Sequence, residues 1–332
     1  MTKATATSRR HAESPVDTAQ RLRAVCRTGI RPFCLAAALA MTCAAGLPAR
    51  AQEQPVSHRF LKSGCGSQSV AIVGRDGRIE WEYRVADETS DAWLLPGGNV
   101  IFAYKHGVRE VTPDQKTAWE FPAPEGAEIH SCQPLPGELF LIGEAHADGT
   151  ANLYELDRTG RKAKTIPING GGGAHSQFRQ VRKTPQGTYL VTYQRDGGQA
   201  KEYDGEGKLL RTFCAGRFVA IRLPNGNTLI ACGDEHRVIE VDPQDGIVWE
   251  VKEKDMPGNV LGFAAGLQRL PNGNTVICNW SGHGGAKDQP QVFELTRDKK
   301  VVWEVRDPRL NMISSINILD APGDVLKGEI LR

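Results

Sequence analysis

A short turn signature recurs along most of this chain and limits the folds that it can adopt. In each copy a residue, usually Leu, precedes a proline, and a glycine follows within two positions; the prolines are Pro96, Pro136, Pro185, Pro224, Pro271 and Pro322. Proline sets φ early in a turn, and glycine supplies the left-handed conformation that closes a hairpin. Strand-like runs such as NVIFAY and NTLIAC follow the turns. The signature therefore predicts a repeated β-hairpin.

A second signature follows each hairpin. It is an apolar-Glu-apolar run, with the glutamates at Glu110, Glu155, Glu202, Glu240 and Glu294. A turn and another apolar strand come next, often with Trp-Glu, at Trp81, Trp119, Trp249 and Trp303. Helical periodicity is absent, and four short strands per repeat are typical of a β-propeller blade. Because these glutamates and tryptophans belong to the repeat, we expect them to serve blade structure.

The ends of the chain predict how the repeat array closes. Five complete units run from about residue 91 to 306, and residues 69–83 and 315–332 each supply two further strands. Pairing these two ends would complete a sixth blade and remove the exposed sheet edges of an open array. We therefore predict an all-β fold, a six-bladed β-propeller with four-stranded blades over residues 69–332. Residues 52–68 are expected to form a short N-terminal lead-in.

The D-G-x-I/V-x-W-E strands and L-P-N-G-N hairpins resemble the quinoprotein-like (PQQ-like) β-propeller repeat family, and also the propeller of bacterial arylsulfotransferases. Quinoprotein alcohol dehydrogenases have eight blades and a vicinal cysteine pair beneath the cofactor. This chain has neither that length nor that pair, so PQQ is not expected, and the resemblance leaves the cofactor unknown. Arylsulfotransferases also carry an extra N-terminal β-domain, which this sequence is not expected to form.

The first fifty residues have the organisation of a secretory signal. Residues 33–47 form an apolar run preceded by several arginines and followed by Ala49-Arg50-Ala51. The run is too short to span a bilayer, and the small residues form a cleavage pattern. We expect a signal peptide over residues 1–51, cleavage near Ala51, and a periplasmic or secreted protein with no membrane span. The alternative is a buried helix of the fold.

Charge and cysteine content exclude several classes of function. Beyond residue 51 the chain carries 33 basic and 37 acidic side chains. This balance gives no electrostatic reason to bind nucleic acid or an anionic membrane. The five cysteines beyond residue 51 form no C-x-x-C motif, and no histidine or carboxylate spacing indicates a particular metal. The sequence therefore assigns no metal site. We also expect the protein to be a monomer.

Turn lengths and histidines point to one face of the predicted disc. The turns within the hairpins are short, whereas the segments expected on the opposite face are long and irregular, and functional residues concentrate on such loops. Six of the seven histidines beyond residue 51 also fall on that face. The candidate catalytic residues are His130 and His175. The candidate ligand-binding residues are Arg179, Arg217, His106, His236 and His283.

Two classes of function remain open. The first is an exported binding protein that presents a polar site to a small polar or anionic ligand, a sugar or a partner protein. The second, which the arylsulfotransferase resemblance implies, is sulfuryl transfer through a channel-facing histidine beside cationic donors. The geometric test that separates them is whether His130, His175 and Arg179 converge within about 8 Å of one another at the mouth of the channel, close enough to share one small anion.

Overall fold

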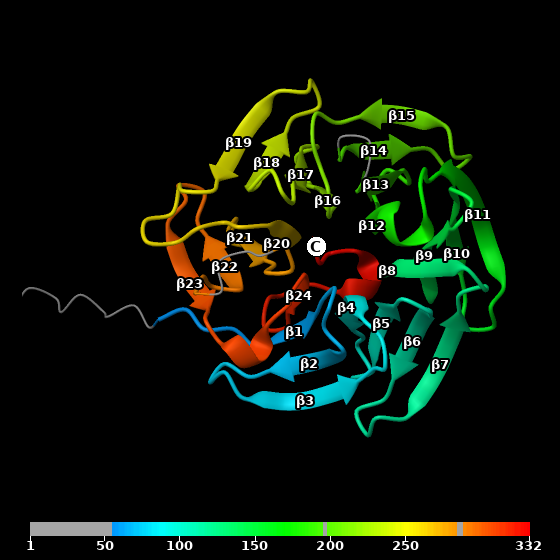
Figure 1. The fold of residues 1–332 in the computed structure, drawn as a ribbon, viewed down its shortest axis with the longest axis horizontal. Coiled ribbons are helices and arrows are strands. Elements are labelled where there is room, and N and C mark those ends of the chain that lie inside the picture. Colours follow the sequence, from blue (N-terminus) through cyan, green and yellow to red (C-terminus); the bar gives the residue numbers. More distant parts are fainter. Residues whose placement is uncertain (1–54, 195–197, 284–287) are drawn as a thin grey trace, which may run out of the picture. The chain divides into compact units, whose positions relative to one another are not determined.

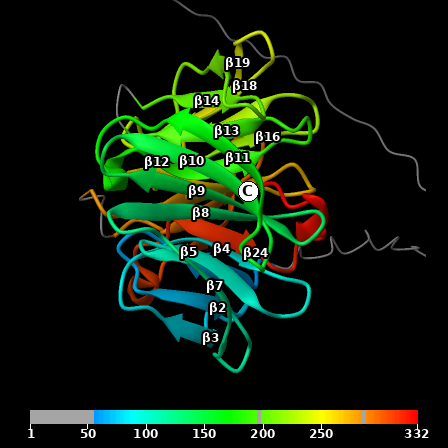
Figure 2. The same ribbon diagram turned by 90° about the vertical axis from the view of Figure 1, so that its right-hand side faces the viewer.

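The computed structural model describes residues 55–194, 198–283 and 288–332, so the expected signal peptide lies outside the described residues. Six four-stranded antiparallel sheets are arranged in a ring around a central axis, which we call the channel (Figures 1 and 2). The helices of the described residues are three short 3-10 turns, and none is long and apolar enough to cross a membrane. The predicted all-β, six-bladed propeller is confirmed.

Each blade runs from an innermost strand beside the channel to an outermost strand at the rim (Figure 1). Blade 1 contains β4 (Thr89–Leu94), β5 (Val100–Tyr104), β6 (Gly107–Val111) and β7 (Thr117–Pro122). Blade 2 contains β8 (Ala127–Leu135), β9 (Leu139–His146), β10 (Thr150–Leu156) and β11 (Lys162–Asn169). Blade 3 contains β12 (Phe178–Lys183), β13 (Tyr189–Tyr193), β14 (Ala200–Tyr203) and β15 (Leu209–Thr212).

The remaining elements complete the ring. Blade 4 contains β16 (Ala220–Arg222), β17 (Thr228–Ala231), β18 (Arg237–Val241) and β19 (Ile247–Lys252). Blade 5 contains β20 (Ala264–Arg269), β21 (Thr275–Asn279), β22 (Val292–Leu295) and β23 (Val301–Val305). The closing blade contains β24 (Ser315–Ile318), β1 (Phe60–Ser63), β2 (Ser69–Val73) and β3 (Ile79–Arg84). The 3-10 turns are η1 (Ala174–Ser176), η2 (Pro308–Leu310) and η3 (Val325–Lys327).

The proline-glycine signature forms the predicted hairpin turn between the two innermost strands of a blade. In blade 4 the amide of Gly226 donates to the carbonyl of Leu223 at 3.0 Å. Gly226 has φ of 88°, a conformation that residues with a Cβ rarely adopt. The amide of Leu223 then donates to the carbonyl of Asn227, which starts the strand pair. We call the side of the ring with these turns the hairpin face and the other side the loop-rich face.

The repeated glutamates join neighbouring blades, as expected of structural residues. Glu240 is buried in β18 and accepts a hydrogen bond from Asn227 Nδ2 at 2.7 Å within its own blade. Its second carboxylate oxygen accepts from Arg269 of blade 5 at 3.0 Å. Trp249 acts similarly, because its indole Nε1 donates to the carbonyl of Arg297 in blade 5. A buried carboxylate paired in this way is not free to act on a ligand, and loss of one partner would leave an uncompensated buried charge between the blades.

The ring closes between the two ends of the propeller, but with a different division of strands from the one predicted. Residues 60–63 form β1, which pairs with β24 in the register Phe60↔Ile318 to Ser63↔Ser315. The closing blade therefore takes three strands from the N-terminal end of the propeller and a single strand from the C-terminal end. The lead-in assigned to residues 52–68 thus includes a strand. No local signal in the sequence marked β1 as a strand, because it has only four residues and no hairpin signature follows it.

The last signature, at Pro322-Gly323, does not lead into a strand. The chain instead forms η3 and then turns into the channel (Figure 1). There the buried guanidinium of Arg332 donates to Asp91 Oδ1 at 3.2 Å, and Arg182 donates to Asp91 Oδ2 at 2.8 Å. These three residues connect blade 1, blade 3 and the C-terminal segment across the channel.

Candidate functional site

Three residues selected from the sequence meet at the loop-rich end of the channel. His130 lies in β8 of blade 2, His175 in η1, and Arg179 in β12 of blade 3. The imidazole rings of His130 and His175 are 5.4 Å apart between centres and nearly perpendicular. A terminal guanidinium nitrogen of Arg179 lies 3.4 Å from His175 Nε2 and another donates to the His175 carbonyl. His175 therefore contacts both His130 and Arg179, and the three side chains lie in one group.

β-Bulges in three innermost strands orient the side chains of this site. The register shifts between Thr89 and Ala92 in β4, between Ile129 and Ser131 in β8, and between Phe178 and Val181 in β12. Ser90, His130 and Arg179 occupy these bulges. A bulge re-aims a side chain that regular pleating would direct elsewhere. His130 was expected just before its strand; it lies inside β8 and its side chain is buried.

Two carboxylates that sequence reasoning did not single out complete the group. Oε2 of Glu128 lies 2.9 Å from His130 Nε2 and 2.8 Å from His175 Nδ1. Oε1 of Glu88, from the link between the closing blade and blade 1, lies 3.7 Å from His175 Nδ1. The Glu-x-His spacing of Glu128 and His130 was the one local signal available. No local signal indicated Glu88, because it reaches the site only through contacts made in the folded ring.

The surroundings shift the pKa values of buried His130 and of its half-buried partner Glu128. Burial lowers the pKa of His130, although hydrogen bonding to Glu128 opposes this effect. Burial alone would raise the pKa of Glu128, but the hydrogen bonds and charges of His130 and His175 outweigh it and bring the pKa to about 2. His130 Nδ1 also lies 3.2 Å from the Ser90 hydroxyl, which fixes the ring orientation. The side chain of His175, in contrast, is 54% exposed and faces solvent.

Two other candidate residues gather around Asp234 on the same face. Nδ1 of His283 lies 2.8 Å from one carboxylate oxygen of Asp234, and Arg217 lies 3.5 Å from the other. The His283 ring also packs edge-on against Phe263 and Trp280, at 5.2 Å and 4.9 Å between ring centres. Arg217 and His283 thus form a second polar group in blades 4 and 5.

The last two candidates lie apart from both groups. His236 Nδ1 lies 2.5 Å from the carbonyl of Gly262, so this ring holds a loop together. His106 is exposed and pairs with Asp87 at 2.9 Å. Within the described ranges, no hydrogen bond or ring contact joins His106 to His130 or His175. The fold therefore divides the seven candidates into one trio, one pair and two separate histidines.

Neither a family model nor a curated protein sequence matches this chain. A crystal structure of a protein of unknown function from Bacteroides caccae is similar, with a TM-score of 0.72 and 31% sequence identity. The similarity covers 79% of this chain and 98% of the Bacteroides protein. This chain belongs to the same family as the Bacteroides protein.

A more distant solved structure shares the architecture of this family. The virginiamycin B lyase of Staphylococcus aureus, crystallised as a catalytically inactive variant with quinupristin, has a TM-score of 0.51 and 11% identity, covering 76% of this chain and 87% of the lyase. A streptogramin B lyase has a TM-score of 0.47 and 13% identity, covering 77% and 85%. Both are β-propeller proteins. At 11% identity the likeness to virginiamycin B lyase shows the fold alone.

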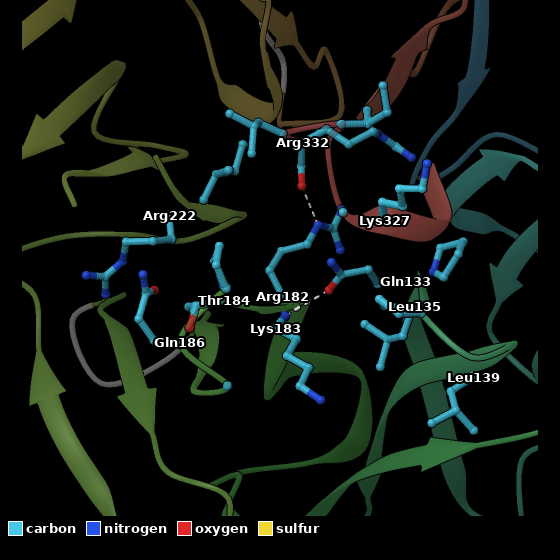
Figure 3. Close-up of a pocket in the computed structure, with 18 of the residues that line it drawn as sticks. Gln133, Leu135, Leu139, Arg182, Lys183, Thr184, Gln186, Arg222, Lys327 and Arg332 are labelled. Atoms are coloured by element: carbon cyan, nitrogen blue, oxygen red, sulfur yellow. Dashed lines mark hydrogen bonds between the residues drawn. The ribbon is translucent and has the colours of Figure 1, made fainter. Parts of the chain in front are cut away.

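A cavity of about 600 Å³ opens on the hairpin face, opposite the predicted site. Figure 3 shows the side chains that line it. The hairpin turns of blades 2 and 3 and the C-terminal segment line it. Its cations already have carboxylate partners: Lys183 lies 2.6 Å from Glu155, and Arg222 lies 2.6 Å from Glu202. Turn length alone did not predict this cavity, because the C-terminal segment forms one of its walls. With its charges paired within the fold, this cavity carries less binding chemistry than the loop-rich mouth.

Proposed function

We propose that this family member is an exported β-propeller protein that binds a small polar ligand with an anionic group at the loop-rich mouth of its channel. The observation that carries the proposal is the position of Arg179. Among the described residues no carboxylate lies within ion-pair distance of its guanidinium, whereas Arg182, Arg217 and Arg222 each have one. An arginine fork held beside an imidazole suits a carboxylate, sulfate or phosphate.

The side chains that would touch a ligand lie at the mouth, and the side chains that orient them lie beneath. His175 and Arg179 are accessible at the mouth, whereas His130 lies beneath them and is almost fully buried. Glu128 contacts both imidazoles and so orients the His175 ring. A ligand would therefore meet Arg179 and His175 first, above the bulged strands β8 and β12.

The test measures binding of sulfate, phosphate and sugar acids by thermal shift and calorimetry. Arg179→Ala should weaken binding about 10- to 100-fold, because a charge-assisted contact contributes about 1.5–3 kcal/mol. The matched control is Arg161→Ala, since Arg161 is an exposed arginine in a turn of the hairpin face. Equal losses in both variants, or no binding to the unchanged protein, would contradict the proposal.

Sulfuryl transfer is the second candidate, and the Glu128–His175 pair favours it. The 2.8 Å contact at Nδ1 leaves Nε2 of His175 directed toward Arg179. In this reaction Nε2 would form a bond to sulfur while the aryl ester S–O bond breaks, and the phenolate released would take a proton from water. A second phenol would then give its proton to the hydroxide left by the first step, and its oxygen would bond to sulfur while the N–S bond breaks and frees His175. Arg179 would hold the sulfonate oxygens throughout.

An aryl sulfate assay separates the two candidates. If the protein transfers sulfuryl groups, nitrophenol release should require His175, and mass spectrometry should find one sulfuryl group on that residue. Binding of aryl sulfates without turnover would leave the binding protein as the function. The resemblance to quinoprotein-like repeats adds no cofactor to either candidate.

Export belongs to the same proposal and has its own measurement. The apolar run over residues 33–47 and the Ala49-Arg50-Ala51 pattern support cleavage near Ala51. Mass spectrometry of the protein from its native cells should find an N-terminus near Gln52 in an extracytoplasmic fraction. An intact Met1 in the cytoplasm would overturn the export proposal. We also expect a monomer, which light scattering of the purified protein would test.

A further inference from the structure

We propose that Glu88, His130 and His175 bind a divalent transition metal ion, with zinc as the best fit, at the loop-rich mouth. This inference deepens the proposed function, because the ion would lie in the same site and add a second positive centre beside Arg179. One ligand atom from each of the three residues lies within 4.8 Å of the other two. The three residues come from the link before β4, from β8 and from η1.

The separations require only small side-chain movements to form a coordination sphere. Zinc binds nitrogen and oxygen ligands at about 2.0–2.2 Å, so two ligand atoms of a tetrahedral site lie roughly 3.3–3.6 Å apart. Oε1 of Glu88 is 3.7 Å from Nδ1 of His175, close to that separation. Nε2 of His130 and Nδ1 of His175 both contact Oε2 of Glu128, at 2.9 Å and 2.8 Å, so the two nitrogens face one point from which an ion would displace this carboxylate oxygen.

The second contacts of these residues match those of metal ligands. An imidazole that binds a metal usually has its other nitrogen held by an oxygen, which fixes the ring. Ser90 provides this contact for His130 Nδ1 at 3.2 Å. Oε2 of Glu88 is held by the backbone amide of Gly66 at 3.3 Å, which directs Oε1 toward His175.

Glu88 supplies an independent observation that favours an ion. Its Oε1 atom is buried and has no hydrogen-bond partner among the described residues. A buried carboxylate oxygen without a partner is costly, and a bound cation would remove that cost. Glu128, which contacts both imidazoles, would add negative charge next to a dication.

The other histidine–carboxylate pairs of the loop-rich face lack this arrangement. His106 with Asp87, His146 with Glu144 and His283 with Asp234 are pairs of one imidazole and one carboxylate. Among the residues that the structure describes, Glu88, His130 and His175 are the group of three or more such ligands that could hold an ion. Two imidazoles and one carboxylate are a common zinc set that leaves a fourth position for water or a ligand. An anionic group could occupy that position while Arg179 holds its other oxygens.

The experiment titrates chelator-treated mature protein with zinc chloride by calorimetry and with cobalt chloride by visible absorption. We expect one ion per chain, with the absorption bands of cobalt in a site of nitrogen and oxygen ligands. Glu88→Gln and His175→Ala should each weaken zinc binding at least about tenfold. The matched control, His106→Ala, removes an exposed histidine of the same face and should leave zinc binding unchanged.

Each outcome supports or overturns the metal proposal separately from the ligand proposal. Absence of stoichiometric binding, or equal weakening in His106→Ala and His175→Ala, would overturn the metal site. Circular dichroism of each variant would show that it is folded, and Glu88→Gln keeps the shape of the side chain. Chelator-treated protein could still bind sulfate or a sugar acid in a way that depends on Arg179. That result would show that the metal is not part of the ligand site, while the proposed function would stand. Loss of that binding with chelator, and its return with zinc, would support both.

Discussion

Nε2 of His58 lies 2.7 Å from Oε2 of Glu294, although the two residues are far apart in sequence. The same imidazole places Nδ1 3.1 Å from Oδ1 of Asp320. Both ring nitrogens therefore face carboxylates, an arrangement that favours the doubly protonated imidazolium. Burial would lower the pKa of His58, but its hydrogen bonds and charge interactions with Glu294 and Asp320 outweigh that effect and raise it. His58 thus connects the start of the propeller to blade 5 and to the C-terminal segment.

This contact predicts a pH-dependent contribution to stability. Because the pKa of His58 is raised on folding, its contribution is complete below the unfolded value of about 6.5 and is lost as pH rises through the folded value. The pKa values of Glu294 and Asp320 are lowered, so the same contacts also weaken when strong acid protonates these carboxylates. His58→Gln should lower the free energy of unfolding by about 1–2 kcal/mol near pH 5.5 and by less near pH 8.5. Urea denaturation at both pH values is the measurement; an equal loss at both would contradict the assignment.

Removal of the C-terminal segment should open the ring. β24 contributes the innermost strand of the closing blade and pairs with β1. Deletion of residues 315–332 would expose the edge of β1 and also remove Arg332 from Asp91. We expect the truncated protein to lose its single cooperative thermal transition. A melting curve like that of the full mature chain would show that the ring does not depend on β24.

Substitution of Asp91 tests the charge network in the channel. Its side chain is fully buried and accepts hydrogen bonds from Arg182 and Arg332. Asp91→Ala would leave two buried guanidinium groups without their shared carboxylate, which should cost about 3–5 kcal/mol of unfolding free energy. The control is Asp114→Ala in an exposed turn, for which we expect a change within about 0.5 kcal/mol. Similar urea midpoints for the two variants would contradict the role assigned to Asp91.

Thiol labelling distinguishes the cysteines by burial. All five cysteines of the described residues are free; Cys214 is exposed and the other four are buried. Burial also raises the pKa of Cys278 to about 12, which suppresses the reactive thiolate. A native protein that begins at Gln52 should therefore react rapidly with one equivalent of a thiol reagent, and denaturation should expose the rest.

Cys214→Ser is the matching variant. It should remove the rapid phase of labelling and leave the total after denaturation lower by one. Rapid labelling that persists in Cys214→Ser would show that a second cysteine is accessible in the native protein.

The buried position of His130 changes which substitutions probe the site cleanly. As a loop residue it would tolerate alanine with little effect on stability. Because His130 is buried in β8 and contacts Ser90 and Glu128, His130→Ala should also destabilise the fold. Arg179 and His175, which are more accessible, are therefore better positions for binding experiments.

The amino-acid sequence by itself determined the blade and the number of blades. Turns such as Leu223 to Asn227 depend on the local preferences of proline and glycine, and the strands between them follow from alternating apolar residues. The structural role of Glu240 was also predictable, since a residue that recurs in every repeat serves the repeat. These conformational preferences depend only on residues close together in the chain, so the sequence alone reveals them.

Only the tertiary structure decided how the ring closes and which groups form the site. β1 is a strand because β24 lies beside it, and nothing within residues 60–63 indicates that partner. Glu88 and Glu128 reach His175 because three neighbouring segments of the ring meet at one end of the channel. The bulges that aim His130 and Arg179 depend on the register between adjacent strands. These features arise from contacts between residues that are distant in sequence. The free energies of such contacts cannot be read from the conformational preferences of short segments.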